Sequence, residues 1–386
     1  MYEQLFHLIP APGAEIDWAS ILQSKLGAVI SPLADIPQNP IWHGEGDALT
    51  HTKMVCESLA SDSEWLSLLE RDRQILFLAA LLHDIGKTSC TRLEDGAWVS
   101  PRHSFEGAKI ARRVLWLDFD MCGTTEKLLT RETICQLICA HMAPVRVADL
   151  PMPERKVIHL SANGHQTVYF TNRLLAILAR ADTLGRIAED TKKSLDAIDF
   201  FSELALEQSC LDTPYPFVTS FERYTYLSGN ERWPNASRYD DRWGRVIMLS
   251  GLPGVGKDTF IHHNLSHLPV ISLDDIREEL HISPHMPQGQ VVSAAKDRAA
   301  ELLRKKQPFV WNATNLTPLV RKKQISLFQA YGASTQIVYL ETNWQEQLHR
   351  NAARSSVVPE RAILHMLEQL TPPLPSEAQE ISWFCV

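Results

Sequence analysis

A glycine-rich segment at residues 251–258, GLPGVGKD, has the residue types and spacing of a phosphate-binding loop. Its glycines, Gly251, Gly254 and Gly256, allow the backbone to curl so that successive N–H groups point toward one anion. Lys257 can then neutralise the β- and γ-phosphates, while the N-terminus of a following helix adds partial positive charge. The spacing Gly-x4-Gly-Lys fits the P-loop pattern. We therefore predict that this loop binds ATP, or another nucleoside triphosphate, with Mg²⁺.

The last position of the loop departs from that pattern. Asp258 stands where serine or threonine usually binds Mg²⁺, and Thr259 follows one place late. Either side chain could hold the metal, or the phosphates could hold most of it. The segment FVWNATN at residues 309–315 also lacks the acid that many P-loop enzymes carry on this strand. A glycine-rich turn that binds nothing is the alternative, but the apolar run before the loop and the helical pattern after it favour nucleotide binding.

Charged side chains follow the loop at two places. Asp274, Asp275 and Arg277 come directly after the strand-like segment PVISL, at the end where ligands bind in open α/β sheets. A carboxylate there can accept a proton from an attacking hydroxyl, and an arginine one turn later can neutralise phosphate. Arg350 and Arg354 lie four apart, so one helix face would present both guanidinium groups. Helix capping and a chance pair on an exposed helix are the plainer explanations.

The first half of the chain carries histidines and aspartates of the kind that bind metals. His83 and Asp84 end a very apolar run, FLAALLHDIGK, where buried polar groups need a partner. Other candidates occur upstream, in HGEGDALTHT, and far downstream, in LARADTLGR. Four histidines and two carboxylates at helix ends could build one or two N/O sites. The candidate ligands are His51, His83, Asp84, His103, His141 and Asp182.

Periodicity divides the chain that must position these residues. Helical patterns predict helices at residues 17–26, 51–61, 71–84, 103–116, 131–141, 172–188 and 194–209, with one strand-like run at 167–171. Strand patterns at 246–250, 270–273, 309–312 and 336–340 alternate with helices, which predicts a parallel sheet covered on both faces. We predict an all-α helical bundle over residues 1–211 with its core at about 40–190, an aromatic-rich linker over 212–244, and an α/β P-loop domain over 245–386.

Composition restricts the classes of function. The 386 residues are 45% apolar and 22% charged, with seven scattered cysteines, as expected of a cytoplasmic globular protein with reduced thiols. We expect neither a secretory signal nor a membrane partner, because no apolar run is long enough. Residues 1–215 carry 20 basic and 29 acidic side chains, whereas residues 245–386 carry 14 and 13. This balance does not suit coating of long nucleic acid, but a nucleic-acid end needs few contacts.

The histidine and aspartate set resembles the HD-domain phosphohydrolases, whose signature is a helix histidine, a later His-Asp pair and a distant aspartate. His51, His83, Asp84 and Asp182 fall on that pattern. The segments HDIGK and RADTLGR are also similar to the HD domain of bacterial tRNA nucleotidyltransferases, which acts on 2′- and 2′,3′-cyclic phosphates. The resemblance implies hydrolysis assisted by a divalent transition metal (Mn, Ni, Co, Zn or Fe), with Asp84 in a catalytic position.

Further side chains of the first half have two possible roles. His103 and His141 match the extra histidines with which HD proteins hold a second metal or position phosphate, although a purely structural role stays open. Lys87 and Arg186, each about one turn beyond a metal-ligand candidate, could bind phosphate oxygens. They could equally be solvated cations at helix ends.

The second half, over residues 245–370, resembles phage 5′-hydroxyl polynucleotide kinase, segment by segment in the same order. The glycine-rich loop, DDIR, TNLTP and RNAARSSVVP all find counterparts. The resemblance implies that Asp274 is the general base and that Arg277 contacts the acceptor phosphate. It also implies that Arg354 binds the donor phosphates with help from Arg350.

An HD unit followed by such a kinase resembles bacterial fusions of HD phosphohydrolase with polynucleotide kinase. The implied function is nucleic-acid end healing: phosphorylation of 5′-hydroxyl ends by ATP, and metal-dependent hydrolysis of 2′-, 3′- or 2′,3′-cyclic phosphate ends. The partners would be RNA or DNA ends, with RNA as the expected substrate, and a ligase could act on the products. One alternative is a nucleoside, sugar or antibiotic kinase fused to an HD nucleotide phosphohydrolase. The other is an HD module that only senses nucleotide.

Overall fold

The computed structural model of the chain describes residues 2–166, 169–237, 239–283, 285–354 and 356–386. The chain divides into two compact units, one comprising Met1–Met121 and Glu126–Pro216 and the other Cys122–Thr125 and Phe217–Val386. Within the described residues, no helix combines the length and the apolar character needed to cross a membrane.

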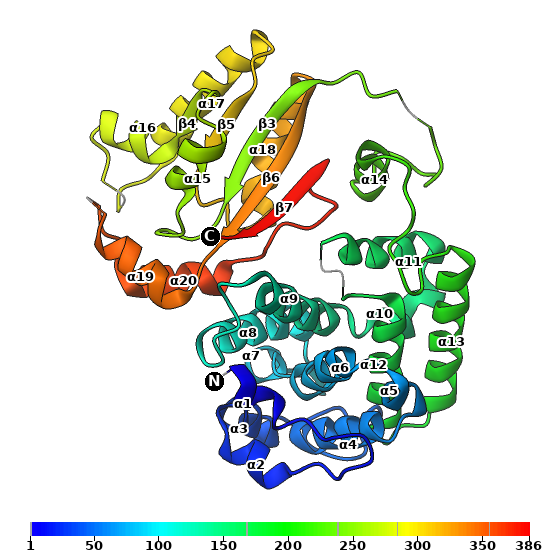
Figure 1. Ribbon diagram of the computed structural model, residues 1–386. Helices are drawn as coiled ribbons and strands as arrows, with labels where there is room; N and C mark the ends of the chain where they lie inside the picture. The colour runs from blue at the N-terminus through cyan, green and yellow to red at the C-terminus, as the bar shows by residue number, and fades with distance from the viewer. Residues whose placement is uncertain (1, 167–168, 238, 284, 355) are drawn as a thin grey trace. The chain divides into compact units, whose positions relative to one another are not determined.

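The first unit is built from helices, shown in blue to green in Figure 1. Every helix that periodicity predicts in this half is present. Its α-helices are α1 (Tyr2–Phe6), α2 (Trp18–Gln23), α3 (Lys25–Ile30), α4 (Ala48–Ala60), α5 (Ser63–Ser67), α6 (Glu70–Leu82), α7 (Lys87–Cys90), α8 (His103–Leu117), α9 (Thr125–Ala140), α10 (Ala143–Arg146), α11 (Pro153–Ser161), α12 (Asn172–Leu184) and α13 (Thr191–Glu207). Short 3-10 helices are η1 (Ser31–Asp35), η2 (Val147–Asp149) and η3 (Ala162–His165).

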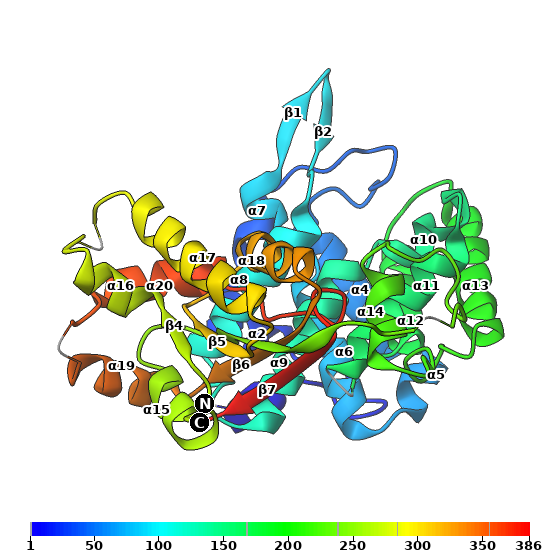
Figure 2. The same ribbon diagram turned by 90° about the horizontal axis from the view of Figure 1, so that it is seen from above.

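A β-hairpin interrupts this unit and was not predicted. Strands β1 (Arg92–Glu94) and β2 (Ala97–Val99) pair antiparallel. They meet at Asp95 and Gly96, both with positive φ, a pair that suits a two-residue hairpin turn. Figure 2 shows the hairpin standing out beyond α7. The strand-like run at 167–171 lies partly outside the described residues, and its described part is turn and irregular chain.

The second unit is an α/β unit around a parallel sheet. In the described residues the sheet has five strands in the order β4-β5-β3-β6-β7, and every pair is parallel, as predicted. The last strand and α14, which lies inside the predicted linker, were not foreseen; the predicted domain boundaries stay predictions. The elements are α14 (Ser220–Leu227), β3 (Trp243–Ser250), α15 (Lys257–Asn264), β4 (Val270–Ser272), α16 (Leu273–Glu279), α17 (Gly289–Arg304), β5 (Phe309–Asn312), α18 (Pro318–Ala330), β6 (Ala333–Glu341), α19 (Trp344–Ala352), α20 (Glu360–Gln369) and β7 (Glu380–Cys385).

Both faces of the sheet are buried, because side chains alternate along each strand. Val246 and Met248 of β3 pack in one core with residues of α17 and α18. Ile247 and Leu249 pack in a second core, on the opposite face, with Ile261 of α15. The central strand β3 is thus fixed from both sides, and the glycine-rich loop leaves its carboxyl end.

Candidate active sites

The candidate metal cluster of the first unit begins where α6 ends. Every residue from Ile75 to Leu82 in α6 is fully buried, so this helix is a central element of the unit rather than an amphipathic surface helix. His83 and Asp84 follow directly and are themselves almost fully buried. The apolar run therefore holds two polar side chains in the interior, where each requires a partner.

Two glycines allow the surrounding helices to approach this point. A Cβ at Gly86 would lie 2.0 Å from the carbonyl oxygen of His103, so only glycine lets α8 begin beside the end of α6. A Cβ at Gly185 would lie 2.6 Å from the Cα of Val55, so only glycine lets the end of α12 pack on α4. Both glycines occur in the segments HDIGK and RADTLGR, and both bring candidate ligands together.

The first group of ligands contains His51, His83 and Asp182. His83 donates from Nδ1 to the carbonyl oxygen of Ala80 at 2.7 Å, which leaves a lone pair on Nε2 in the neutral ring. That nitrogen faces Nε2 of His51 at 3.4 Å, and Nε2 of His51 faces Oδ1 of Asp182 at 3.0 Å. Once the ring of His51 gives up its proton on Nε2, three atoms with lone pairs converge, and a cation among them would offset their mutual repulsion.

The second group contains Asp84, His103 and His141. His103 and His141 each direct Nδ1 to a backbone carbonyl, of Ser100 at 2.8 Å and Ile138 at 2.7 Å. Because a carbonyl only accepts, both Nδ1 atoms carry hydrogen, and the two Nε2 lone pairs face each other at 3.4 Å. Two acceptors at this distance again fit a cation between them.

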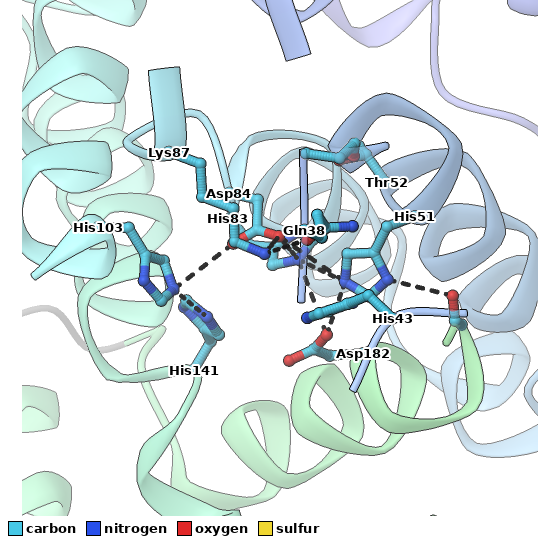
Figure 3. A network of polar contacts seen from close by, with 12 residues as sticks. Gln38, His43, His51, Thr52, His83, Asp84, Lys87, His103, His141 and Asp182 are labelled. Carbon is cyan, nitrogen blue, oxygen red and sulfur yellow. Dashed lines mark hydrogen bonds and ion pairs between the residues drawn. The ribbon is translucent and has the colours of Figure 1, made fainter. Parts of the chain in front are cut away.

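Asp84, a member of the second group, also faces the first, as Figure 3 shows. Its Oδ2 is 3.3 Å from Nε2 of His83, and its Oδ1 is 3.5 Å from Nε2 of His103. Oδ2 also forms an ion pair with Nζ of Lys87 at 2.7 Å, so the lysine is a buried partner of the cluster and not a solvated cation at a helix end. A carboxylate with one oxygen toward each group is suited to bridge two divalent ions.

The charge states of the cluster agree with metal binding. Burial, next to His83 and His103, lowers the pKa of His141 to about 3, so its ring is neutral and able to coordinate. Although burial opposes it, Lys87 and His83 hold the pKa of Asp84 well below its usual range. Burial also opposes protonation of His51, but its contacts with Asp182 and Glu45 raise the pKa of its ring to about 9. A divalent ion at this place would replace that proton.

Glu45 is a candidate functional residue that sequence reasoning missed. Its buried carboxylate faces Nδ1 of His51 at 3.0 Å and Nδ1 of His43 at 2.8 Å, and it accepts from the N–H of Ile187 at 2.9 Å. It thereby turns Nε2 of His51 toward Asp182, as outer carboxylates do for metal-binding histidines. His43, Glu45 and His51 are close enough to form a ligand group themselves, but both histidines use Nδ1 on one carboxylate oxygen. The signal in the sequence was an acid six residues before His51, in HGEGDALTHT.

Five of the six candidate metal ligands, all except His83, line a cavity of about 620 Å³. This volume lies within the range of clefts that hold whole small molecules. Trp42, Trp98, Arg146 and Arg186 also line it, and they come from segments far apart in the first unit. Arg186 donates to Ser194 at 2.8 Å. The lining of the cavity therefore includes basic side chains and indoles as well as aliphatic side chains.

The glycine-rich loop of the second unit has the backbone that the sequence predicts. Gly251, Gly254 and Gly256 all have positive φ. A Cβ at Gly254 would lie 2.8 Å from the carbonyl oxygen of Gln347, so α19 packs against the loop itself. Lys257 begins α15 and donates to the carbonyl oxygens of Gly251 and Leu252 at 3.1 and 3.0 Å. Burial lowers the pKa of Lys257 to about 8.

The loop's unusual residue has a partner on the neighbouring strand. Asp258 is exposed at the start of α15, and its Oδ1 accepts from Nδ2 of Asn312 at 2.7 Å. Asn312 is the last residue of β5, on the strand from which an acid is missing. Many P-loop enzymes have a hydroxyl side chain in the loop and an acid on this strand. Here the loop carries the acid, Asp258, and the strand carries a neutral side chain, Asn312. Both end at the carboxyl edge of the sheet, where Mg²⁺ is expected. Thr259 is exposed one residue further along α15.

Asp274 and two of the predicted arginines meet at the same edge. Arg277 donates to Oδ1 of Asp274, and Nη2 of Arg354 lies 3.2 Å from its Oδ2. Although burial opposes it, these arginines and Lys257 lower the pKa of Asp274. Arg350 instead pairs with Glu346 at 2.7 Å and donates to the carbonyl oxygen of Val255, in the loop. The N–H of Gly251 also donates to the carbonyl oxygen of Thr314, in TNLTP, at 2.9 Å, so the four predicted motifs of the second half converge on one region.

Comparisons with known proteins agree with this division of the chain. Residues 48–186 match the family described as HD domain, and residues 246–373 match a family described as AAA domain. A solved structure from Chloroflexus aurantiacus J-10-fl, described as a candidate kinase, is 16% identical, covers 37% of this chain and 88% of that chain, and has a TM-score of 0.31. A TM-score this low supports no inference about activity. The chain therefore joins a helical unit that matches the HD domain to an α/β unit that matches the AAA domain and carries the P-loop pattern.

Proposed function

We propose that the chain is a bifunctional enzyme that heals the ends of broken RNA. The P-loop unit would transfer the γ-phosphate of ATP to a 5′-hydroxyl end, and the HD unit would hydrolyse 2′-, 3′- or 2′,3′-cyclic phosphate ends. The observation that carries the proposal is the meeting of Asp274 with Arg277 and Arg354 beside the phosphate loop. It supports the proposal, because the resemblance to polynucleotide kinases implies that these three side chains act as the base, the contact to the acceptor phosphate and the lid arginine.

In the kinase half, each side chain would have a separate task. Asp274 would accept the proton of the 5′-hydroxyl as the oxygen attacks the γ-phosphorus. Arg277 would neutralise the phosphate next to that hydroxyl, while Lys257 and Arg354 would neutralise the transferring group. Arg354 now lies on Asp274, so nucleotide binding would draw this arginine to the phosphates and free the carboxylate. Mg²⁺ bound with ATP would be held near Asp258 and Asn312.

In the HD half, the chain's residues would hold and orient the phosphate end. The ligands would be His51, His83, Asp84, His103, His141 and Asp182. Divalent ions there would acidify a water molecule and polarise the phosphoryl group. Lys87 would compensate the charge of the phosphate, and no covalent intermediate on the protein is required. This unit resembles HD domains that act on such ends, which is what connects it with the kinase half.

The division of labour can be tested with two substitutions. Purified protein is given γ-labelled ATP, a 5′-hydroxyl oligoribonucleotide and an oligoribonucleotide with a 2′,3′-cyclic phosphate. Lys257→Ala should abolish only the transfer of label, and Asp84→Ala should abolish only the release of phosphate. Loss of both activities in a folded single variant would contradict two independent sites. Transfer of label to a nucleoside, sugar or aminoglycoside, but not to the oligonucleotide, would instead indicate a small-molecule kinase.

A further inference from the structure

The tryptophans of the HD cavity are not used by the chemistry described so far. The chain has ten tryptophans, all within the described residues, and three of them are exposed: Trp42 (46%), Trp98 (38%) and Trp233 (65%). Two of these three, Trp42 and Trp98, line the same cavity as the candidate metal ligands. An exposed indole leaves a large apolar face in water, and two beside one opening indicate a ligand with a flat apolar surface.

The segments that carry Trp42 and Trp98 contribute little to the hydrophobic core. Trp98 lies in β2, opposite Leu93 of β1, and both side chains are exposed, so the hairpin contributes no core of its own here. The base of the hairpin is fixed by a hydrogen bond of 2.8 Å between the hydroxyls of Thr91 and Ser100. Trp42 precedes His43, the partner of Glu45 at the metal cluster. The segment of Trp98 contacts the cluster through Ser100, which accepts from His103, and the segment of Trp42 contacts it through His43.

The charged lining of the cavity identifies the rest of the ligand. Outside the candidate metal ligands and histidines, the cavity is lined by four basic side chains and two acidic ones. One of the acids, Asp190, is 3.7 Å from Arg186. The basic side chains are Lys87, Arg146, Arg186 and Lys193; the acidic ones are Asp149 and Asp190. With Asp84 and Asp182 included, four basic and four acidic side chains balance, so divalent ions at the cluster would make the lining positive and suit it to a phosphate. A volume of about 620 Å³ leaves space for much more than a phosphate.

We propose that Trp42 and Trp98 recognise the base of the terminal nucleotide by stacking, while its 2′- or 3′-phosphate reaches the metal cluster. Stacking on an aromatic side chain tolerates every base, because each has a π-face, and it selects nucleotides over other phosphate esters. The inference rests on the proposed function of the HD unit and deepens it. It assigns the preference for a nucleic-acid end to the cavity wall rather than to the catalytic residues.

The test compares two ligands that share a phosphate and differ in the base. Adenosine 2′-monophosphate and glycerol 2-phosphate are titrated calorimetrically into the full chain. Trp98→Leu and Trp42→Leu should each weaken binding of the nucleotide about tenfold, leaving that of glycerol 2-phosphate unchanged. Trp98→Phe, which keeps a π-face, should restore most of the loss. Trp233→Leu, at the exposed tryptophan of the other unit, is the matched control and should change neither.

The possible outcomes separate this inference from the function on which it rests. If the unaltered protein binds both ligands equally, the HD unit does not recognise nucleotides, and the proposed function of that unit fails together with the inference. If the unaltered protein prefers the nucleotide but the leucine variants keep that preference, only the stacking assignment is overturned. A loss in the leucine variants that phenylalanine does not restore would likewise overturn stacking, because it would show a need for indole size rather than for a π-face.

Discussion

The two candidate sites differ in how completely the polypeptide alone assembles them. In the HD unit, ring nitrogens from α4, α8 and the ends of α6 and α9 converge within hydrogen-bonding distance, and backbone carbonyls fix the rings. In the P-loop unit, the side chain of Asp274 is 65% exposed, and the arginines reach it from flexible side chains on α16 and beyond α19.

The ligands proposed for the two sites, a metal ion and a nucleotide, account for this difference. A metal ion needs several donors at fixed positions, and buried donors without a cation repel one another, so the helices must hold them firmly. A nucleotide brings its own charge and must enter and leave, so the side chains that close over it must be able to move. On the proposed function, the metal-ligand cluster is a rigid site, and the phosphate site is completed by its substrate.

The rigid site should lose both metal and activity when Asp84, which faces both groups of ligands, is substituted. Asp84→Asn keeps the size of the side chain but removes its charge and one ligand oxygen toward the two groups. We expect bound metal to fall from two ions to one or none, and phosphohydrolase activity to fall by more than about a thousandfold. Metal content measured by mass spectrometry, with 5′-kinase activity as the control, tests this. Unchanged metal content would show that Asp84 does not bridge ions.

The flexible site should lose rate rather than structure. Arg354→Ala removes a cation from the transferring phosphate, and we expect kcat of the kinase to fall by about a hundredfold to a thousandfold. Arg361→Ala, at an exposed arginine on α20, is the matched control and should leave kcat unchanged. Thermal unfolding should be the same for both variants. An equal effect of the two substitutions would remove Arg354 from the site.

Glu45 tests how far rigidity depends on residues outside the ligand set. Glu45→Gln should weaken metal binding by about tenfold to a hundredfold, because the charge is lost and the amide nitrogen must face either the N–H of His51 or that of Ile187, two donors, which loosens the orientation of the ring. Competition with a chelating indicator measures this affinity directly. Glu64→Gln, at an exposed position in α5, provides the control. If metal affinity is retained, Glu45 only ties its loop to Ile187.

The smallest expected effect concerns the pH dependence of ATP binding. Burial lowers the pKa of Lys257 to about 8, and only the protonated amine attracts phosphate. The competent fraction therefore falls as pH rises above that value, and the Kd for ATP should increase about tenfold between pH 7 and pH 9. Lys257→Arg stays protonated throughout and should give a flat profile. A rise of equal size in this variant would assign the pH dependence to another group.

Much of both sites was predicted from local patterns. The glycines and Lys257 form a loop because their spacing serves one short turn, and β3 precedes it because a run of branched apolar residues favours a strand. The helices that carry the metal-ligand candidates follow from apolar periodicity over a dozen or more residues. Short elements gave no such signal: the hairpin β1–β2 has only three residues in each strand, and α14 lies in a segment rich in turn formers.

The sequence by itself determined which side chains are candidate metal ligands, the phosphate loop, the parallel sheet and the order of the two domains, because each depends on neighbours along the chain. Tertiary structure alone decided that Asp84 faces both histidine groups, that Glu45 orients His51, and that Asn312 contacts Asp258. It also decided that Trp42 and Trp98 share one cavity. Such pairings depend on how helices and strands distant in sequence pack, and no local periodicity encodes the distance between two side chains that different elements carry.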